Sequence, residues 1–385
     1  MKKIALIALI AFGGTTAFAQ TVRPITTGVP FLQIAADARS AGMGDMGVAT
    51  TTDAFSQQYN PAKYAFATQN QGFAVSYTPY MSKITNDISL AQLNYFNKFN
   101  ERSAVGASLR YFGMGEVHFR QDYNDPGYAR KPNELALDVS YSLKLNENFG
   151  MGIAGRFINS NLKLAEEVGG DASSASSFAV DVAGFYESDQ MSFNGFDGRW
   201  RAGFNFQNLG PKMKYDADDL NAAFLPSNLK LGAGFDFILD SHNTLTLTTE
   251  FNKLLVPTPI KPDNKSASAI EKARREYNDI GWFSGVFKSF GDAPDGLSEE
   301  FKEITWALGA EYWYDNAFAF RAGYFHESEE KGARKFASLG AGFRYNVVTV
   351  DVSYLFSTSK VSNPLENTLR FSLTFDFGNK SYSKG

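Results

Sequence analysis

The sequence predicts an all-β fold, a transmembrane antiparallel β-barrel of about 14 strands with an N-terminal plug, or hatch, in its lumen. Three observations support this prediction. The chain begins with an export signal, many segments alternate between apolar and polar residues with a period of two, and the connections between these segments alternate between short and long.

Residues 1–19 have the features of a secretory signal peptide. Lys2 and Lys3 supply positive charge, Ile4–Phe12 is a short apolar stretch, and small residues at 17 and 19 form a cleavage site. The apolar stretch is shorter than the ~20 residues that a membrane-spanning helix needs. We therefore expect export and cleavage after Ala19.

The composition excludes several classes of protein. The chain has no Cys, which excludes a disulfide framework, a thiolate metal site and a lipid anchor on cysteine. No later apolar stretch approaches the length of a spanning helix, so a helical membrane protein is excluded. A pI near 5.6 and the lack of a basic cluster argue against nucleic acid as a partner. Aromatic residues nevertheless make up 15% of the chain, an unusual enrichment for a soluble protein.

The clearest alternation lies in Glu134–Leu145, where every second residue from Leu135 is apolar and the residues between are polar or small. Thr368–Phe377 repeats this pattern. A period of two indicates strands with one apolar face. We predict strands at 72–80, 87–98, 103–113, 134–145, 149–160, 177–187, 199–208, 228–239, 244–255, 304–314, 317–326, 336–346, 347–357 and 367–377. Segments 87–98 and 177–187 fit least well, so 12 or 16 strands remain alternatives to about 14.

The lengths of the connections support closure into a membrane barrel. Connections after even-numbered strands are short apart from Glu187–Gly198, whereas those after odd-numbered strands are mostly long. Outer-membrane barrels have this asymmetry, with short periplasmic turns and long extracellular loops. The predicted long loops are Met114–Asn133, Asn161–Ser176, Leu209–Ser227 and Val256–Glu303.

The two faces of the strands predict two environments. The apolar face meets lipid, and Tyr77, Trp200, Trp306, Tyr312 and Tyr314 are candidates for aromatic girdles at the membrane interfaces. The polar face carries acids and bases interspersed, which predicts a hydrated lumen stiffened by ion pairs, with a charge-selective filter as the alternative. These inward charges are Arg110, Asp138, Arg156, Asp181, Arg199, Arg201, Asp236, Glu250, Glu311, Arg321, Arg344, Asp351 and Arg370.

Residues 20–70 do not alternate and are rich in Ala, Gly and Thr, which predicts a plug folded into the lumen. Within it, Phe31–Ser40 predicts a short helix. Gly42–Gly47 matches a G-x-G-x-x-G pattern, but no βαβ unit surrounds it, so we expect no bound nucleotide or other cofactor. We expect a signal peptide at 1–19, a plug at 20–70, a barrel at 71–378 with a long loop at 256–303, and a tail at 379–385.

Part of the plug resembles a known family. Ser40–Ala49, Asp53-Ala54 and Asn60-Pro61-Ala62 resemble the hatch of FadL-type barrels of the outer membrane protein transport superfamily, and Phe31–Gly44 is similar to the PorV (LptO) family of Bacteroidetes. The residues that carry this motif are Ser40, Gly42, Gly44, Asp45, Gly47, Asn60 and Pro61.

The resemblance implies an outer-membrane component of the type IX protein secretion system. Such proteins associate with a giant translocon barrel, receive cargo with a conserved C-terminal domain, and deliver it to a surface attachment complex containing a sortase-like protease. They have also been linked to lipopolysaccharide modification, which these residues neither support nor exclude. FadL itself passes long-chain fatty acids, so a channel for apolar small molecules is the alternative.

The sequence predicts neither an enzyme nor a metal site. His118, His242 and His326 fall in a long loop, a tight turn and a strand end, so they do not converge. No histidine pair has the spacing of metal ligands, and there is no G-x-S-x-G nucleophile motif. A lipase on a barrel, with a Ser/His pair facing lipid, is the alternative.

The loop Val256–Glu303 is the most informative segment outside the strands. Ala267–Tyr277 predicts a helix, and an apolar cluster follows it. Long loops without function are uncommon, and exposed aromatics mark contact surfaces. We therefore predict partner contacts here and in the loop Met114–Asn133, with a lid over the barrel mouth as the alternative. The predicted contact residues are Trp282, Phe283, Val286, Phe287, Phe290, Phe119, Tyr123 and Tyr128.

Overall fold

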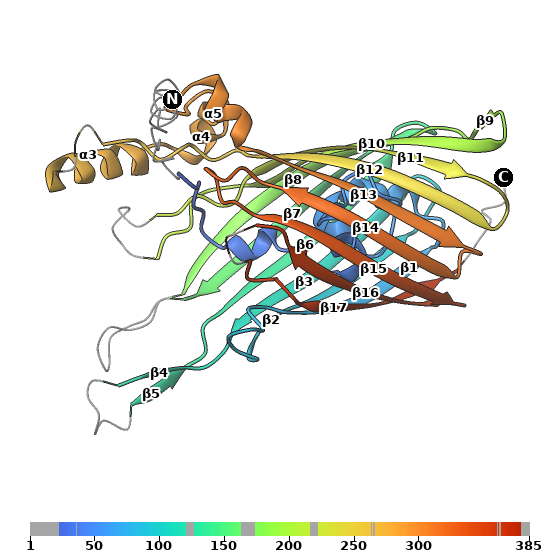
Figure 1. Cartoon of the computed structure of the whole chain (residues 1–385), viewed down its shortest axis with the longest axis horizontal. Coiled ribbons are helices and arrows are strands. Elements are labelled where there is room, and N and C mark those ends of the chain that lie inside the picture. The colour runs from blue at the N-terminus through green and yellow to red at the C-terminus, as the bar shows by residue number, and fades with distance from the viewer. Residues whose placement is uncertain are drawn as a thin grey trace, which may run out of the picture.

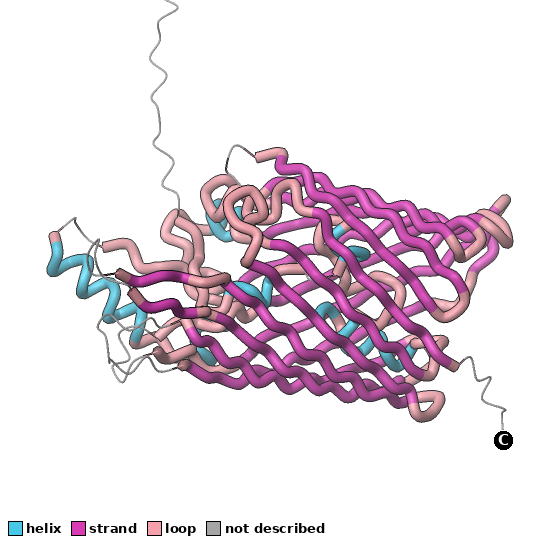
Figure 2. The backbone as a smooth tube through the Cα atoms, turned by 90° about the horizontal axis from the view of Figure 1, so that it is seen from below, coloured by secondary structure: helices cyan, strands magenta, loops and turns pink. Residues whose placement is uncertain are grey.

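The computed structural model of the chain describes residues 23–35, 37–120, 127–162, 174–215, 222–262, 264, 266–359, 361 and 363–378. The predicted signal peptide and C-terminal tail lie outside these residues. Within them, 14 strands form a closed antiparallel barrel, because the first and the last also pair, with Gly72 opposite Asp376. The tilted strands enclose several short helical segments (Figures 1 and 2).

The wall strands match the predicted segments to within a few residues, so the predicted fold class is confirmed, including the two weakest segments. They are β1 (Gln71–Pro79), β2 (Ile88–Lys98), β3 (Ser103–Met114), β6 (Asn133–Lys144), β7 (Phe149–Asn161), β8 (Ala175–Glu187), β10 (Phe196–Leu209), β11 (Asn228–Ile238), β12 (Asn243–Leu254), β13 (Ile304–Tyr314), β14 (Phe318–His326), β15 (Lys335–Tyr345), β16 (Val348–Ser357) and β17 (Leu369–Phe377).

Three further short strands were not predicted. β4 (Val117–Phe119) and β5 (Tyr128–Arg130) form a separate hairpin beyond the wall. β9 (Met191–Phe193) pairs with the start of β10 inside the one long connection on the short side. Gly195, at φ +97°, makes the turn between β9 and β10, a conformation that favours glycine.

The alternation places apolar side chains outside and polar ones inside. In β6, Leu137, Val139 and Tyr141 are exposed, whereas Asp138 and Ser140 are buried. The connections segregate by length (Figure 1): the long loops lie at one end, here called the long-loop end, and the tight turns lie at the other, the short-turn end. In the part of the chain that the structure describes, no helix is both long and apolar enough to span a membrane.

The segment before β1 lies inside the barrel as four short helical elements: η1 (Pro30–Gln33), α1 (Ala38–Ala41), α2 (Ser56–Tyr59) and η2 (Pro61–Phe66). The prediction of one helix over Phe31–Ser40 is wrong, because the chain is extended at Ile34. Asp37 accepts a hydrogen bond from the Ser40 amide at 2.8 Å. This N-cap starts a separate helix, α1, instead of continuing η1.

The long loop between β12 and β13 contains three helices: α3 (Ala267–Asn278), α4 (Trp282–Lys288) and α5 (Leu297–Lys302). α3 covers the predicted helix, and the Ser266 hydroxyl accepts from the Ala269 amide at its start. The predicted apolar cluster begins on α4. Figure 1 shows α4 and α5 at the edge of the barrel, next to the long-loop ends of β12 and β13.

A charge on the outward face should disturb the barrel. Val139 lies in the middle of β6 and is 60% exposed. Val139→Arg should lower the unfolding free energy in vesicles by ~2–4 kcal/mol, because an arginine at the bilayer midplane is costly. Urea unfolding measures this effect, with Val139→Leu as the control. Equal stability of the two variants would show that this face does not meet lipid.

Candidate functional site: the sealed lumen and the long-loop rim

A chain of alternating charges joins the plug to the wall. Arg39 of the plug binds Glu311 of β13 with two hydrogen bonds, of 2.7 and 2.9 Å, and Asp53 of the plug at 2.6 Å. Glu311 also accepts from Arg321 at 2.6 Å, and Arg321 binds Asp351 at 2.7 Å. These groups are largely withdrawn from solvent, so each depends on its neighbour for neutralisation. The ion pairs expected within the lumen are present, and they also hold the plug.

Other wall side chains bind the plug backbone directly. Glu250 accepts hydrogen bonds from the amides of Gly47 and Val48, both at 2.9 Å. Arg110 donates to the carbonyls of Phe31, Leu32 and Ile34 at 2.8 to 3.1 Å. Backbone groups in irregular structure need such partners when they are buried. The inward charges thus replace the hydrogen bonds that water would otherwise make with the plug.

Glycines of the plug motif lie at close contacts, either with the wall or within the plug. A Cβ on Gly323 of β14 would lie 2.2 Å from the amide nitrogen of Gly44, too close for any side chain. Gly44 itself has φ +77°. A Cβ on Gly47 would lie 2.2 Å from the Tyr59 ring. These residues are glycine because two backbones, or a backbone and a ring, meet there without space for a side chain.

The remaining motif residues connect the plug internally and to the wall. Asn60 donates to the carbonyls of Val48 at 2.9 Å and of Gly184 in β8 at 3.0 Å. The Pro61 carbonyl accepts from the Ser142 hydroxyl of β6 at 2.6 Å. Asp45, at φ +62°, pairs with Arg370 at 3.0 Å. The Ser40 amide takes part in the α1 cap, so these motif residues make contacts within the plug or between the plug and the wall.

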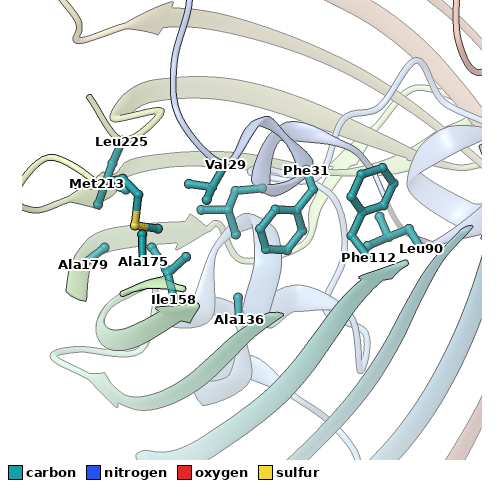
Figure 3. Close-up of a cluster of buried hydrophobic side chains, with 11 residues drawn as sticks. Val29, Phe31, Leu90, Phe112, Ala136, Ile158, Ala175, Ala179, Met213 and Leu225 are labelled. Carbon is teal, nitrogen blue, oxygen red and sulfur yellow. The ribbon is translucent and has the colours of Figure 1, made fainter. Parts of the chain in front are cut away.

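The lumen on either side of these contacts differs in polarity. At the short-turn end a cavity of about 270 Å³ is lined mainly by charged and hydroxyl-bearing side chains, among them Glu187, Arg199 and Asp376. Toward the long-loop end, apolar side chains of the wall enclose the chain's own Val29, Phe31 and Leu32 (Figure 3); the wall residues are Leu90, Phe112, Ala136, Ile158, Ala175 and Ala179. The apolar part of the lumen is therefore filled by the plug.

The predicted contact residues of the long loop gather on and beside α4. Phe283 and Phe287 are 62% and 65% exposed, with ring centroids 5.3 Å apart, and Phe290 is also exposed. Trp282 packs edge-on against Phe283, and both Trp282 and Val286 are half-buried. Gly285 packs α4 against loop residues Phe224 and Pro257.

The residues predicted in the other loop form a separate region. The backbones of Phe119 and Tyr128 are opposite one another in the β4–β5 hairpin, and Tyr123 lies outside the described residues. Figure 1 shows this hairpin and α4 at opposite edges of the long-loop end. The structure therefore does not join the two groups into one surface.

An ion cluster at the long-loop rim was not predicted. Lys331 binds Glu299 at 2.6 Å and Glu303 at 2.8 Å, while Lys253 binds Glu303 at 2.8 Å and Glu300 at 3.0 Å. Arg23 binds Glu299 at 3.0 Å. The spacing of Glu299 and Glu303 was a signal for one acidic helix face, but their partners lie far away in sequence. Burial alone would raise the pKa of Glu303, yet hydrogen bonds from Lys253 and Lys331 lower it below its ordinary value.

The three histidines remain apart, as expected. His118 pairs with Glu116, His242 binds Asp315 at the short-turn end, and His326 stacks on the outward Trp306 with ring centroids 5.0 Å apart. Among the described residues, no group of three His, Asp or Glu side chains is placed to hold a metal ion.

The close approach of the Gly44 and Gly323 backbones leaves no space for a side chain at Gly323. Gly323→Ala should lower barrel stability by ~1–3 kcal/mol, because the plug backbone must move away from the added methyl. It should also raise the ion conductance of the protein in planar bilayers, since a displaced plug would leave more of the lumen open to ions. Gly155→Ala is the matched control, because a Cβ at Gly155 meets nothing within 4 Å. If both variants behave alike, the plug does not depend on this contact.

The rim cluster should fix the loop that carries α5. Lys331→Met should loosen this loop by ~1–3 kcal/mol, because Glu299 and Glu303 each lose one of two cationic partners. They keep only Arg23 and Lys253, respectively. The pKa values of both acids are lowered in the folded chain, by hydrogen bonds that outweigh burial. Their stabilisation is therefore present above the ordinary Glu pKa of 4.5 and lost as pH falls through the lowered values.

Hydrogen exchange in residues 256–303 of Lys331→Met checks this prediction. Lys302→Met is the control, since Lys302 makes a more exposed pair with Glu330, worth about 1 kcal/mol or less. Unchanged exchange in Lys331→Met would contradict the assigned role.

Comparison with known proteins agrees with this architecture. The family described as type IX secretion system protein PorV matches residues 17–261, well over half of the chain. No curated protein sequence matches. The toluene transporter TodX of P. putida is 10% identical, with a TM-score of 0.52 over 89% of this chain and 98% of that one.

Two other solved barrels are similar. The monoaromatic hydrocarbon channel CymD is 14% identical, with a TM-score of 0.50 over 89% of this chain and 97% of that one. A Pseudomonas aeruginosa FadL homologue is 13% identical, covers 92% of this chain and all of that one, and has a TM-score of 0.43. At such low identity these likenesses concern the fold alone. The sequence match carries the assignment: the chain belongs to the PorV family of type IX secretion system proteins, and its fold is a closed antiparallel β-barrel.

Proposed function

We propose that this chain is a docking component of type IX secretion in the outer membrane. Its long-loop end faces the cell exterior, binds the giant translocon barrel, and holds the C-terminal domain of emerging cargo. It then passes this cargo to the surface attachment complex with its sortase-like protease. The role is one of binding and requires no catalysis and no cofactor.

One observation carries the proposal: the plug fills the apolar part of the lumen, while exposed aromatic side chains gather at the long-loop rim. The plug is bound to the wall through buried ion pairs such as Arg39–Glu311, and the apolar part of the lumen is occupied by Phe31 and its neighbours. At the rim, the loop between β12 and β13 instead leaves Phe283, Phe287 and Phe290 exposed. Clustered aromatics of this kind often dominate the energy of protein contacts.

We assign the contact with the translocon to the α4 patch, formed by Trp282, Phe283, Val286, Phe287 and Phe290. α4 rests on Phe224 and Pro257, so the patch is supported from below by other loop residues. A pre-organised surface loses less conformational entropy on binding than a mobile one. The β4–β5 hairpin, with Phe119 and Tyr128, is a second site and suits a different partner, because it lies at the opposite edge. Tyr123, between these two residues in the sequence, is proposed as part of the same site.

The second candidate is a channel for long-chain fatty acids or other apolar small molecules. It is favoured by the fold likeness to TodX and CymD, which are described as a toluene transporter and a monoaromatic hydrocarbon channel. The polar cavity at the short-turn end and the filled apolar region of the lumen favour docking over this alternative.

Gentle detergent extraction of a tagged copy from its native membrane separates the two candidates. Docking predicts co-purification with a very large barrel protein and with secreted cargo. Isolation of the chain alone, with bound fatty acid that added ligand displaces, would replace docking by the channel. Lipopolysaccharide bound in either preparation is expected of any protein in that membrane.

The same extraction tests the α4 patch. Phe283→Ser with Phe287→Ser should reduce recovery of the large barrel roughly 30-fold or more, since two central aromatics each contribute ~1–2 kcal/mol or more. Ile270→Ser on α3 is the control, because it removes an exposed apolar side chain from the same loop outside the patch. Both proteins should remain heat-modifiable on gels. Undiminished recovery in the double variant would remove α4 from the interface.

A further inference from the structure

α5 is folded with its two acidic side chains inside and its two apolar side chains outside. Glu299 and Glu300 are 3% and 7% exposed, whereas Leu297 and Phe301 are 73% and 70% exposed. A short helix on a surface that meets water ordinarily has the opposite arrangement. The inversion is stabilised by the rim cluster, in which Lys331, Lys253 and Arg23 neutralise the buried acids.

The direction of the apolar face follows from these pairs. Lys253 is near the end of β12, Lys331 belongs to the loop between β14 and β15, and Arg23 belongs to the segment that enters the lumen. All three lie on the barrel side of α5. The opposite face, with Leu297 and Phe301, therefore points away from the barrel, outside the rim of the wall.

The height of α5 relative to the membrane follows from β13. This strand begins at Ile304, and its outward Trp306 packs beside Tyr324 and His326 in an aromatic group typical of a membrane interface. Tyr314 marks the other end of the same face, roughly 20 Å away along the barrel axis for a strand tilted by ~40°, close to the ~25 Å of a barrel's apolar band. α5 ends at Lys302, immediately beyond this interface.

We propose that α5 is an interfacial anchor whose Leu297 and Phe301 side chains enter the lipid leaflet at the long-loop end. The wall has the same inversion, with apolar side chains outward and charges inward, because its outer face meets lipid. α5 continues that lipid-facing surface past the end of β13. The apolar face of α5 contacts the region between lipid headgroups and acyl chains, where amphipathic helices bind. α4 differs in packing on loop residues, so its patch is left to a protein partner.

Anchoring would fix the rim in the plane of the membrane. The loop between β12 and β13 is long, and without a second attachment its helices could rotate about the strand ends. The buried acids tie α5 to the barrel, and the apolar face ties it to lipid. The α4 patch would thereby be held at a constant height above the membrane. The inference is independent of which partner the patch binds.

The absence of cysteine from the chain allows a direct test with single-cysteine variants. Leu297→Cys and Phe301→Cys are labelled with an environment-sensitive fluorophore in the purified full-length protein, which is reconstituted into phosphatidylcholine vesicles. Lipids with a spin label near the headgroup then quench any probe in the leaflet. Leu308→Cys on the outward face of β13 is the lipid control, and Ser268→Cys on the exposed surface of α3 is the water control.

Both α5 probes should show quenching comparable to that at Leu308→Cys and several-fold greater than that at Ser268→Cys. Quenching equal to that of the water control at both positions would overturn the proposal. If those probes became shielded only after the translocon complex is added, the face would belong to a protein contact instead. Heat-modifiability confirms that each variant is folded, and substitutions of exposed side chains leave the buried acid cluster in place.

Discussion

The charges on the inner wall impose the constraint on which the rest of the structure depends. An isolated charge removed from water is costly, and a buried pair loses most when one partner is taken away. Glu311 stands between Arg39 of the plug and Arg321 of the wall, and Asp53 and Asp351 complete the alternating series. Withdrawal of the plug would leave the wall members of this series incompletely paired. The series therefore fixes the position of the plug, and the plug neutralises part of the wall.

This constraint accounts for the composition of the plug. A backbone with few side chains can approach the wall closely enough for Glu250 and Arg110 to reach its amides and carbonyls. Close approach in turn requires glycine on both sides, as at Gly44 and Gly323. Ion pairing and close backbone packing thus depend on each other. The lack of alternation and the small-residue composition predicted the plug, and the contacts explain why those residue types occur there.

The extent to which the sequence predicts this structure depends on the range of the interactions. The strands follow from a local period of two, so their ends are predicted to within a few residues. The break at Asp37 was missed because one side-chain cap outweighed an otherwise helical composition. Partners such as Arg39 and Glu311 are separated by 272 residues, and no local pattern relates them. The rim cluster was missed for the same reason, since the sequence shows the acids on α5 but not which distant lysines pair with them.

The plug in the lumen and the helices at the long-loop rim are held by the same arrangement, in which charged side chains lie inside and apolar side chains lie outside. The charged side chains of the strands mostly point into the lumen, and the outer face of the wall is mainly apolar. α5 continues this arrangement beyond the ends of the strands. The acids of α5, Glu299 and Glu300, are bound by Lys331 of the loop between β14 and β15 and by Lys253 of β12. The loop that carries α5 is therefore attached to the same wall that binds the plug. A lumen that opened readily would move these attachment points. A tightly held plug is therefore what a docking surface at the rim requires, whereas a conduit would need the same contacts to break repeatedly.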